Sequence, residues 1–353
     1  MGARRPRRVV GGGLGSEKTM RLITTLILGI ALWFGGAPVA AAQCVGSDLF
    51  AALANDEPQR HAEILAKART VPNGQGKFWR VERPGIAPSY LFGTFHDTGA
   101  GAEALDPAVE QALSGARLML VELTDAEEAE MKTRMATDPG FILSRSGNGI
   151  IAQLSEAERA TAGERLAERG LGLDMAERLK PWMLFTSLAL PTCMIREAQA
   201  GKPILDDLLA QRATSAGVPV GGLETYEEAL GALIDLPEAD IVAMVLDLLR
   251  SPYDEQDVWR TSANLYRAGE IAAIWEFSQA EAEKTIGAKQ SAEVFARFEK
   301  EMLVDRNRAW MTALEPALAD GNVFAAFGAL HLVGETGIVE LLRARGYTVT
   351  RLD

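Results

Sequence analysis

The sequence predicts a mixed α/β (α+β) domain of two related sheet-bearing halves packed together, surrounded by helices and carrying a large helical insertion. Two observations favour it. Each half has one strand-like run ending in Gly-x-x-His and another ending in an acidic residue. Long segments with helical spacing of apolar residues separate these runs. No linker rich in Gly or Pro follows residue 86, so we expect one domain over residues 43–353.

The first half begins with a predicted helix over residues 47–70, with Ser47 as its N-cap. Residues 78–81 and 89–92 flank a Pro-Gly turn and predict a hairpin. Asp106 followed by Pro107 begins a helix, because Asp caps and Pro suits the first turn. The nearly continuous apolar run 117–123 predicts a strand buried on both faces.

The remaining chain is mostly helical. Residues 125–215 form the insertion, in which Ser155 and Glu158 make a capping box and a buried helix stops near Pro191. Residues 226–318 are again helical. Strands are expected at 218–223, 322–329 and 347–352, and a helix at 334–345.

Composition limits the function. The chain has 36 Lys and Arg and 48 Asp and Glu, which gives a formal charge of −12. An acidic protein surface repels the phosphate backbone of nucleic acids. We therefore expect no nucleic-acid partner. Two Cys and three His cannot build a zinc site with three or four thiolates.

Residues 1–42 are predicted to be a secretory signal peptide. A basic segment precedes the apolar run 22–34, and an Ala-x-Ala site precedes Gln43. Met20 is an alternative start, and an N-terminal membrane anchor is the alternative interpretation. No later segment offers 18 uninterrupted apolar residues, so no stable anchor is expected after cleavage. The mature protein is expected to be periplasmic or secreted.

The two cysteines are expected to form one disulfide. Disulfides persist in oxidising compartments, and export would place Cys44 and Cys193 in one. The alternative is two buried thiols.

Two of the three histidines follow a glycine by three positions, at the ends of predicted strands. These are His96 after Gly93 and His331 after Gly328. Glycine there would let the chain turn sharply off the strand and place the histidine at the sheet edge, where α/β proteins bind ligands. The alternative is two core histidines with satisfied hydrogen bonds. His61 lies on a polar helix face and is expected at the surface.

Acidic residues end two further strands. Glu122 must be paired, protonated or metal-bound, because burying it alone costs several kcal/mol. An ion pair with an arginine is the structural alternative. Glu224 occupies the matching place in the second half, or caps the next helix. Arg306 and Asn307, among apolar helix residues, could pair with Glu122, bind substrate or serve the fold.

Six segments of the chain carry a resemblance to a known family: "SYLFGTFHDTG", "LMLVEL", "LKPWM", "GGLETYEEAL", "RNRAWM" and "FGALHLVGETGIVELLRARGYTV". Together they resemble the TraB/PrgY/GumN family, which is related to the animal Tiki metalloproteases. The resemblance covers about residues 45–353. It implies two sheet-bearing halves and a divalent-metal site. Carried onto this chain, the implied ligands are His96, His331 and Glu122. Departures are Phe95, usually aliphatic, and the absence of the animal proteins' C-terminal anchor.

The prediction is an exported, divalent-metal-dependent hydrolase, most simply a peptidase acting on a peptide or protein. Two His and a carboxylate leave a coordination position open for water, with Glu122 as ligand or general base. Mixed N and O ligands admit Zn or Fe as well, while the resemblance favours Mn or Co. The alternative is a non-catalytic exported protein that binds a peptide or saccharide, linked to polysaccharide biosynthesis.

Overall fold

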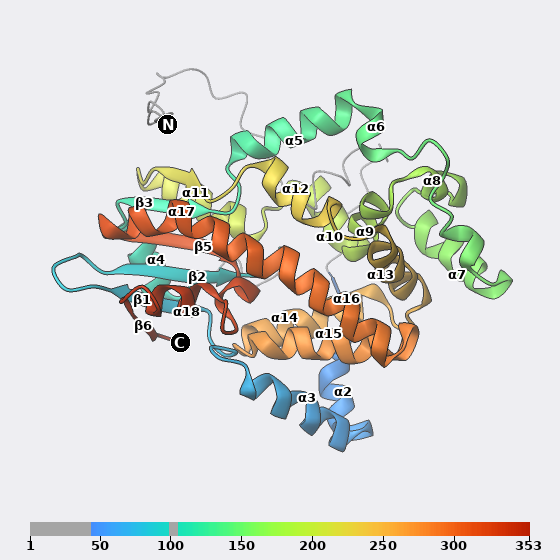
Figure 1. Cartoon of the computed structure of the whole chain (residues 1–353), viewed down its shortest axis with the longest axis horizontal. Coiled ribbons are helices and arrows are strands. Elements are labelled where there is room, and N and C mark those ends of the chain that lie inside the picture. Colours follow the sequence, from blue (N-terminus) through green and yellow to red (C-terminus); the bar gives the residue numbers. More distant parts are fainter. Residues whose placement is uncertain (1–43, 99–104) are drawn as a thin grey trace.

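The computed structural model describes residues 44–98 and 105–353. The predicted signal peptide and its cleavage site lie outside these residues. The described chain contains one six-stranded sheet with the order β4-β3-β5-β2-β1-β6 (Figure 1). Its strands are β1 Phe78–Glu82, β2 Ser89–Thr94, β3 Leu118–Val121, β4 Val220–Gly222, β5 Val323–Gly328 and β6 Thr348–Arg351.

Strands from both halves of the chain are interleaved in this sheet, with β1 and β2 of the first half as neighbours. β5 pairs in parallel with β3 on one side and β2 on the other, and β4 pairs in parallel with β3. β1 is antiparallel to both β2 and β6. The mixed α/β class expected from the sequence is confirmed, with the strands of the two halves joined in one sheet.

The central strand β5 carries apolar side chains on both faces of the sheet, so helices must pack on both faces. Val323, Ala325 and Phe327 point into one core, which α17 and α18 complete. Phe324 and Ala326 point into a second core, which α4 and α11 complete. All five are buried, so burial of this hydrophobic strand between two helical layers stabilises the arrangement.

Helices form most of the rest of the described chain and extend away from the sheet (Figure 1). In the first part of the chain they are α2 Leu49–Asp56, α3 Pro58–Thr70, α4 Pro107–Ser114, α5 Asp125–Thr137, α6 Pro139–Ile142, α7 Glu156–Ala167, α8 Leu173–Arg178, α9 Pro181–Ala189, α10 Thr192–Gln199 and α11 Leu205–Ser215. In the second part they are α12 Tyr226–Ile234, α13 Glu238–Arg250, α14 Glu255–Arg267, α15 Ile271–Ile286, α16 Ala288–Glu299, α17 Arg306–Ala319 and α18 Ile338–Arg343. Short turns of other helix types are η1 Ile151–Gln153, η2 Lys300–Asp305 and η3 Ala329–Leu332.

The helical body has its own hydrophobic core. Trp182 and Leu184 of α9 pack there with Leu166 of α7 and Val245 of α13. The capping box at Ser155 is present, and α9 ends before Pro191 as expected. The predicted helical insertion over residues 125–215 is thus confirmed.

Two helix predictions need correction. The segment 47–70 is two helices, because Pro58 cannot continue the first one and instead starts the second. Asp48, not Ser47, caps α2 by accepting from the backbone N–H of Ala51. The final helix begins only at Ile338, since the preceding residues form η3 and a turn.

The disulfide prediction is confirmed. Cys44 and Cys193 are bonded, with 5.2 Å between their Cα atoms and 149 positions between them in sequence. The bond ties the start of the described chain to α10. Among the described residues, no helix has the length and apolar character needed to cross a membrane.

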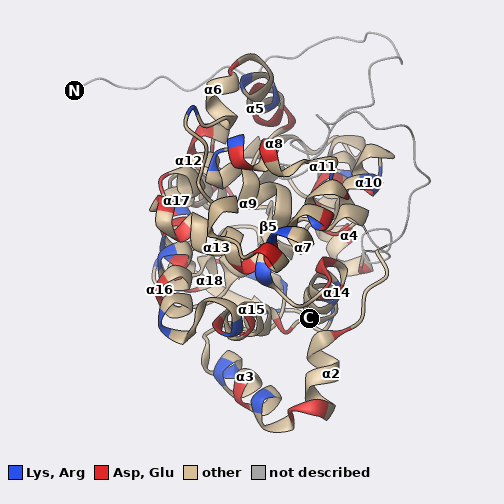
Figure 2. Cartoon of the chain, turned by 90° about the vertical axis from the view of Figure 1, so that its right-hand side faces the viewer, with Lys and Arg blue, Asp and Glu red and all other residues tan. Residues whose placement is uncertain are grey.

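Acidic and basic residues are interspersed along the surface helices, as the view of the helical side shows for α3 (Figure 2). On α3 itself, Lys67 pairs with Glu276 of α15 at 2.6 Å, and Arg60 contacts Glu281 at 3.5 Å. Charges on this side therefore partly neutralise one another locally, whatever the net charge of the chain.

Candidate functional site

Four neighbouring parallel strands bring the predicted site residues to one edge of the sheet. His96 follows β2 by two positions, Glu122 follows β3 directly and Glu224 follows β4 by two positions. His331 lies in η3, which β5 enters at Gly328. Parallel strands end on the same side, so residues far apart in sequence meet at this edge.

His331 is a buried histidine with a defined tautomer. Its Nδ1 lies 2.6 Å from Oδ1 of Asn307, whose Nδ2 donates to the carbonyl of Thr336 at 3.0 Å. Because that amide presents its oxygen, the imidazole donates from Nδ1 and keeps the lone pair on Nε2. Burial, reinforced by the nearby Arg306, lowers the pKa of His331 to about 3. The ring is therefore neutral at physiological pH.

His96 has the opposite electrostatic environment. Its Nδ1 donates to Oδ2 of Asp206 at 3.0 Å, and Oγ1 of Thr94 donates to the other carboxylate oxygen at 2.6 Å. Burial would lower the pKa of His96, but Asp206, together with Glu122 and Asp207, raises it to about 9. In the absence of a metal this imidazole is protonated at neutral pH.

A guanidinium joins the two strand-end carboxylates. Nη2 of Arg306 lies 2.8 Å from Oε2 of Glu122 and 2.5 Å from Oε1 of Glu224. Its Nη1 lies 3.3 Å from Nε2 of His331. The backbone N–H of Gly328 also donates to Glu122, at 2.7 Å. Burial opposes the charge of Glu122, but Arg306 lowers the pKa of this carboxyl to about 2.

The ion pair between Glu122 and an arginine, the structural alternative considered above, is thus present. Glu224 does not cap α12, because Thr225 does so. Arg306 begins α17 directly after the π-helical segment η2. Such segments inside helices are frequent at functional sites.

The two motif glycines serve close packing rather than a sharp turn. Neither is among the residues with positive φ. A Cβ on Gly93 would lie 2.8 Å from Cα of Ala329 and 2.7 Å from Cδ1 of Leu332, so glycine lets β2 approach η3. A Cβ on Gly328 would lie 3.3 Å from Oε1 of Glu122. The expectation that these glycines let the chain turn sharply off the strand is corrected accordingly.

Sequence reasoning missed the acidic group beside His96. Asp206 and Asp207 lie in the first turn of α11, where acidic residues are common, so no sequence signal distinguishes them. Burial, with Glu128 and Asp206 nearby, raises the pKa of Asp207 to about 8. His61 takes no part in the site. It packs on Phe50, with ring centroids 4.4 Å apart.

The nitrogen and oxygen donors of the site suit a divalent metal, but the Arg306 guanidinium already lies among them. Each imidazole commits Nδ1 to a side-chain oxygen, which is how proteins orient metal-binding histidines for ligation through Nε2. Within the described part of the chain, however, no group of three or more His, Cys, Asp or Glu is placed to hold a metal. Arg306 contacts both Glu122 and His331, so a metal held by all three predicted ligands would have to displace its guanidinium.

Two relatives named metalloproteases match part of this chain. The chain is 24% identical over 325 residues to "Metalloprotease TIKI1" of Danio rerio, covering 77% of this chain and 62% of that protein. It is 26% identical over 196 residues to "Metalloprotease TIKI2" of Xenopus tropicalis, covering 49% and 36%. The chain thus spans less than two thirds of either relative. No solved structure gives a significant match.

The sequence profile of the TraB/PrgY/gumN family matches residues 77–351, which include all six strands and every residue of the site described above. This match extends over well more than half of the chain. The protein therefore belongs to the TraB/PrgY/gumN family.

Proposed function

We propose that the protein is a divalent-metal-dependent peptidase whose centre comprises His96, His331 and Glu122. The observation that carries the proposal is the pair of imidazoles at one sheet edge, each with Nδ1 held by a side-chain oxygen. The two relatives named metalloproteases support the reaction class. The expected substrate is a peptide or protein, and Mn or Co is the favoured metal, with Zn or Fe as alternatives.

Each residue has a role in this proposal. A bound metal would polarise the scissile carbonyl and lower the pKa of water, and His96 and His331 would hold it through Nε2. Glu122 stays ionised because Arg306 and the Gly328 N–H stabilise its charge, so it can act as a ligand or accept a proton. Arg306 can stabilise negative charge that develops on a substrate oxygen. Asp206 and Asn307 orient the two imidazoles.

A second function, binding of a peptide or saccharide without cleavage, is favoured by one observation. Arg306 already neutralises Glu122 and contacts Nε2 of His331. If this arrangement persists in solution with metals present, the edge would be a polar binding pocket. Under this proposal no turnover occurs with any metal.

The two proposals are separated by metal analysis and a cleavage assay. Protein purified without chelator is analysed for metals and incubated with a peptide library plus Mn, Co, Zn or Fe. We expect cleavage that His96→Ala and His331→Ala each abolish together with metal binding. His61→Ala is the matched control, because that histidine lies outside the site, and should retain both.

Glu122→Gln then assigns the third residue. We expect folded, inactive protein; retained metal would make Glu122 a proton acceptor, and lost metal would make it a ligand. Full hydrolytic activity in either motif-histidine variant would overturn the metal-centre proposal. Absence of turnover in the wild type with every metal, together with saturable peptide binding, would favour the binding protein.

We also propose that the protein is exported to the periplasm or medium. The disulfide supports this, because such bonds persist in oxidising compartments. Intact-mass analysis of exported protein should give a chain that starts at or near Gln43. A mass that retains residues 22–34 would contradict removal of the leader.

A further inference from the structure

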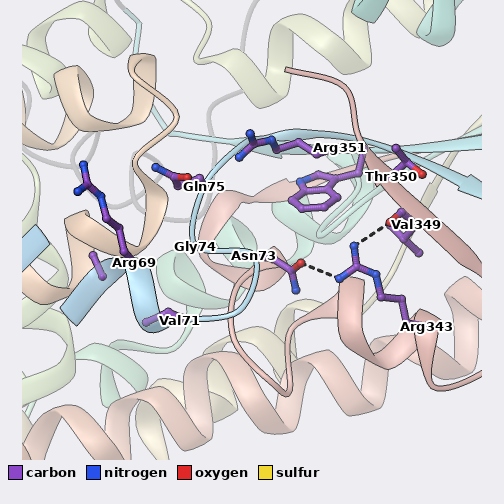
Figure 3. Close-up of a pocket in the computed structure, with 11 residues that line it drawn as sticks. Arg69, Val71, Asn73, Gly74, Gln75, Arg343, Val349, Thr350 and Arg351 are labelled. Carbon is purple, nitrogen blue, oxygen red and sulfur yellow. Dashed lines mark hydrogen bonds between the residues drawn. The ribbon is translucent and has the colours of Figure 1, made fainter. Parts of the chain in front are cut away.

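A cavity of about 480 Å³ lies at the β1–β6 side of the sheet, formed by residues outside the candidate site (Figure 3). Its volume falls in the range typical of small-molecule sites. Three elements each supply an arginine to its lining: Arg69 from α3, Arg343 from α18 and Arg351 from β6. Three cationic side chains therefore line one cavity in a protein of net charge −12.

Two of these arginines have no ion-pair partner among the residues that the structure describes. Within residues 44–98 and 105–353, neither Arg69 nor Arg351 forms an ion pair, and both are exposed. Arg343 differs, because Nη1 pairs with Oε1 of Glu340 at 2.7 Å and donates to Asn73, while Nη2 donates to the carbonyl of Val349 (Figure 3). These bonds hold Arg343 in place as part of the cavity wall. The guanidiniums of Arg69 and Arg351 can bind a ligand.

The nearby carboxylates do not cancel this charge. Glu340 is occupied by Arg343 and by Nδ2 of Asn73, which donates at 2.9 Å. Asp353 accepts the backbone N–H groups of Lys77 and Phe78 at 3.0 to 3.1 Å. Both acidic side chains are committed to structural hydrogen bonds.

The cavity also contains an unused donor. Trp79 lines it and is only 3% exposed, yet its indole N–H has no hydrogen-bond partner among the described residues. Buried donors without partners are rare, because each costs the desolvation of a polar group. An acceptor atom of a ligand could satisfy this N–H.

The loop 71–75 that borders the cavity is held in place. The backbone N–H of Gly334 donates to the carbonyl of Pro72 at 2.7 Å, and Asn73 is fixed by Glu340 and Arg343. A ligand would therefore meet a largely pre-formed wall, which lowers the entropic cost of binding.

We propose that this cavity binds a small dianion, with its two charges on phosphate or carboxylate groups held by Arg69 and Arg351. Guanidinium groups present forked N–H donors that match the oxygens of both anion classes. Two unpaired guanidiniums at one cavity fit two anionic charges. The proposal is independent of the metal centre and of the reaction proposed above.

Calorimetric titration of the full exported protein tests dianion binding. Inorganic phosphate and succinate are the probes, and acetate at matched ionic strength is the monovalent comparison. We expect saturable 1:1 binding of at least one dianion, weaker binding of acetate and loss of affinity as salt is raised. Stronger binding of phosphate identifies a phosphorylated ligand, and stronger binding of succinate identifies a dicarboxylate.

Variants locate the site. Arg69→Gln and Arg351→Gln should each weaken dianion binding about tenfold or more, because each removes a charge-assisted contact. Arg145→Gln is the matched control, an exposed arginine outside the cavity, and should bind like the wild type. Both cavity arginines are exposed, so the variants should fold, which thermal unfolding verifies.

A second measurement reports on the cavity wall. The indole N–H resonance of Trp79, assigned by its loss in Trp79→Phe, should shift on addition of the bound dianion. Either of two results would overturn the proposal: no saturable binding of phosphate or succinate, or an affinity of the Arg69→Gln/Arg351→Gln double variant equal to that of Arg145→Gln.

Discussion

Asp206 accepts a hydrogen bond from Nδ1 of His96 at 3.0 Å, across 110 positions of sequence. The carboxylate is itself held by Oγ1 of Thr94, which ends the strand that carries His96. This contact fixes which imidazole nitrogen faces the site. It also stabilises the protonated ring, and thereby raises the pKa of His96.

Replacing Asp206 should change His96 directly. In Asp206→Asn we expect the pKa of His96 to fall toward the ordinary value of about 6.5, because the neighbouring negative charge is lost. NMR titration of the imidazole in metal-free protein measures this. If the proposed metal binds, its affinity should fall roughly 10- to 100-fold in the same variant.

Asp207→Asn is the matched control for that variant. Asp207 is the next residue, but its raised pKa of about 8 leaves it largely protonated at neutral pH, so an amide changes its charge little. An equal effect of both substitutions on His96 would contradict a specific role for Asp206.

Removal of the bridging guanidinium should destabilise the fold. Arg306→Met leaves Glu122 and the buried Glu224 without their shared counter-charge, which should cost about 3–5 kcal/mol of unfolding free energy. Urea denaturation measures it. Arg308→Met is the control, since that side chain is 61% exposed and should change stability by only about 0.5 kcal/mol.

A double variant isolates the interaction between Arg306 and Glu224. Adding Glu224→Gln to Arg306→Met removes one of the two unpaired charges and should recover part of the loss. If the losses of unfolding free energy in Arg306→Met and in Glu224→Gln simply add in the double variant, Arg306 and Glu224 do not interact energetically.

Gly93→Ala should disturb the packing between β2 and η3. The new Cβ would lie 2.8 Å from the backbone of Ala329, so η3 must move, at a cost of about 1–3 kcal/mol. Because η3 carries His331, peptide cleavage should fall as well. Thermal unfolding and the cleavage assay measure the two effects.

Gly172→Ala provides the comparison for this substitution. Gly172 has φ −86° and nothing within 4 Å of a built Cβ, so alanine fits there without strain. Equal stability and activity of the two alanine variants would contradict the close-packing role assigned to Gly93.

The stability of metal-free protein should depend on pH through His96. Its pKa is about 9 in the folded state and about 6.5 when unfolded, so folding favours the protonated form. The stabilisation is fully present below about pH 6.5 and is lost as pH rises through about 9. The difference in unfolding free energy between wild type and His96→Gln should shrink over that window. A difference that stays constant would contradict the assigned shift.

The disulfide should contribute strongly to stability. It joins residues 149 positions apart, and loss of such a bond costs on the order of 2–5 kcal/mol. We expect Cys44→Ser/Cys193→Ser to unfold at lower urea concentration than the wild type. A midpoint equal to that of the wild type, with an unchanged urea dependence, would show that the bond is not stabilising.

Most of the secondary-structure elements, and the residues able to carry chemistry, could be predicted from the sequence. The nearly continuous apolar run 117–123 identified β3, because a strand buried on both faces is apolar at almost every position. The two Gly-x-x-His motifs and Glu122 were recognisable because a strand end is where such side chains can reach solvent and ligand.

How these residues interact could not be predicted and follows from the tertiary structure. It joined the strands of both halves in one sheet, paired Asp206 with His96 and placed Arg306 between Glu122 and Glu224. None of these contacts is local in sequence, so no periodicity or spacing encodes them. They arise because packing brings strand ends, α11 and α17 together, and because buried charges must then find partners in that environment.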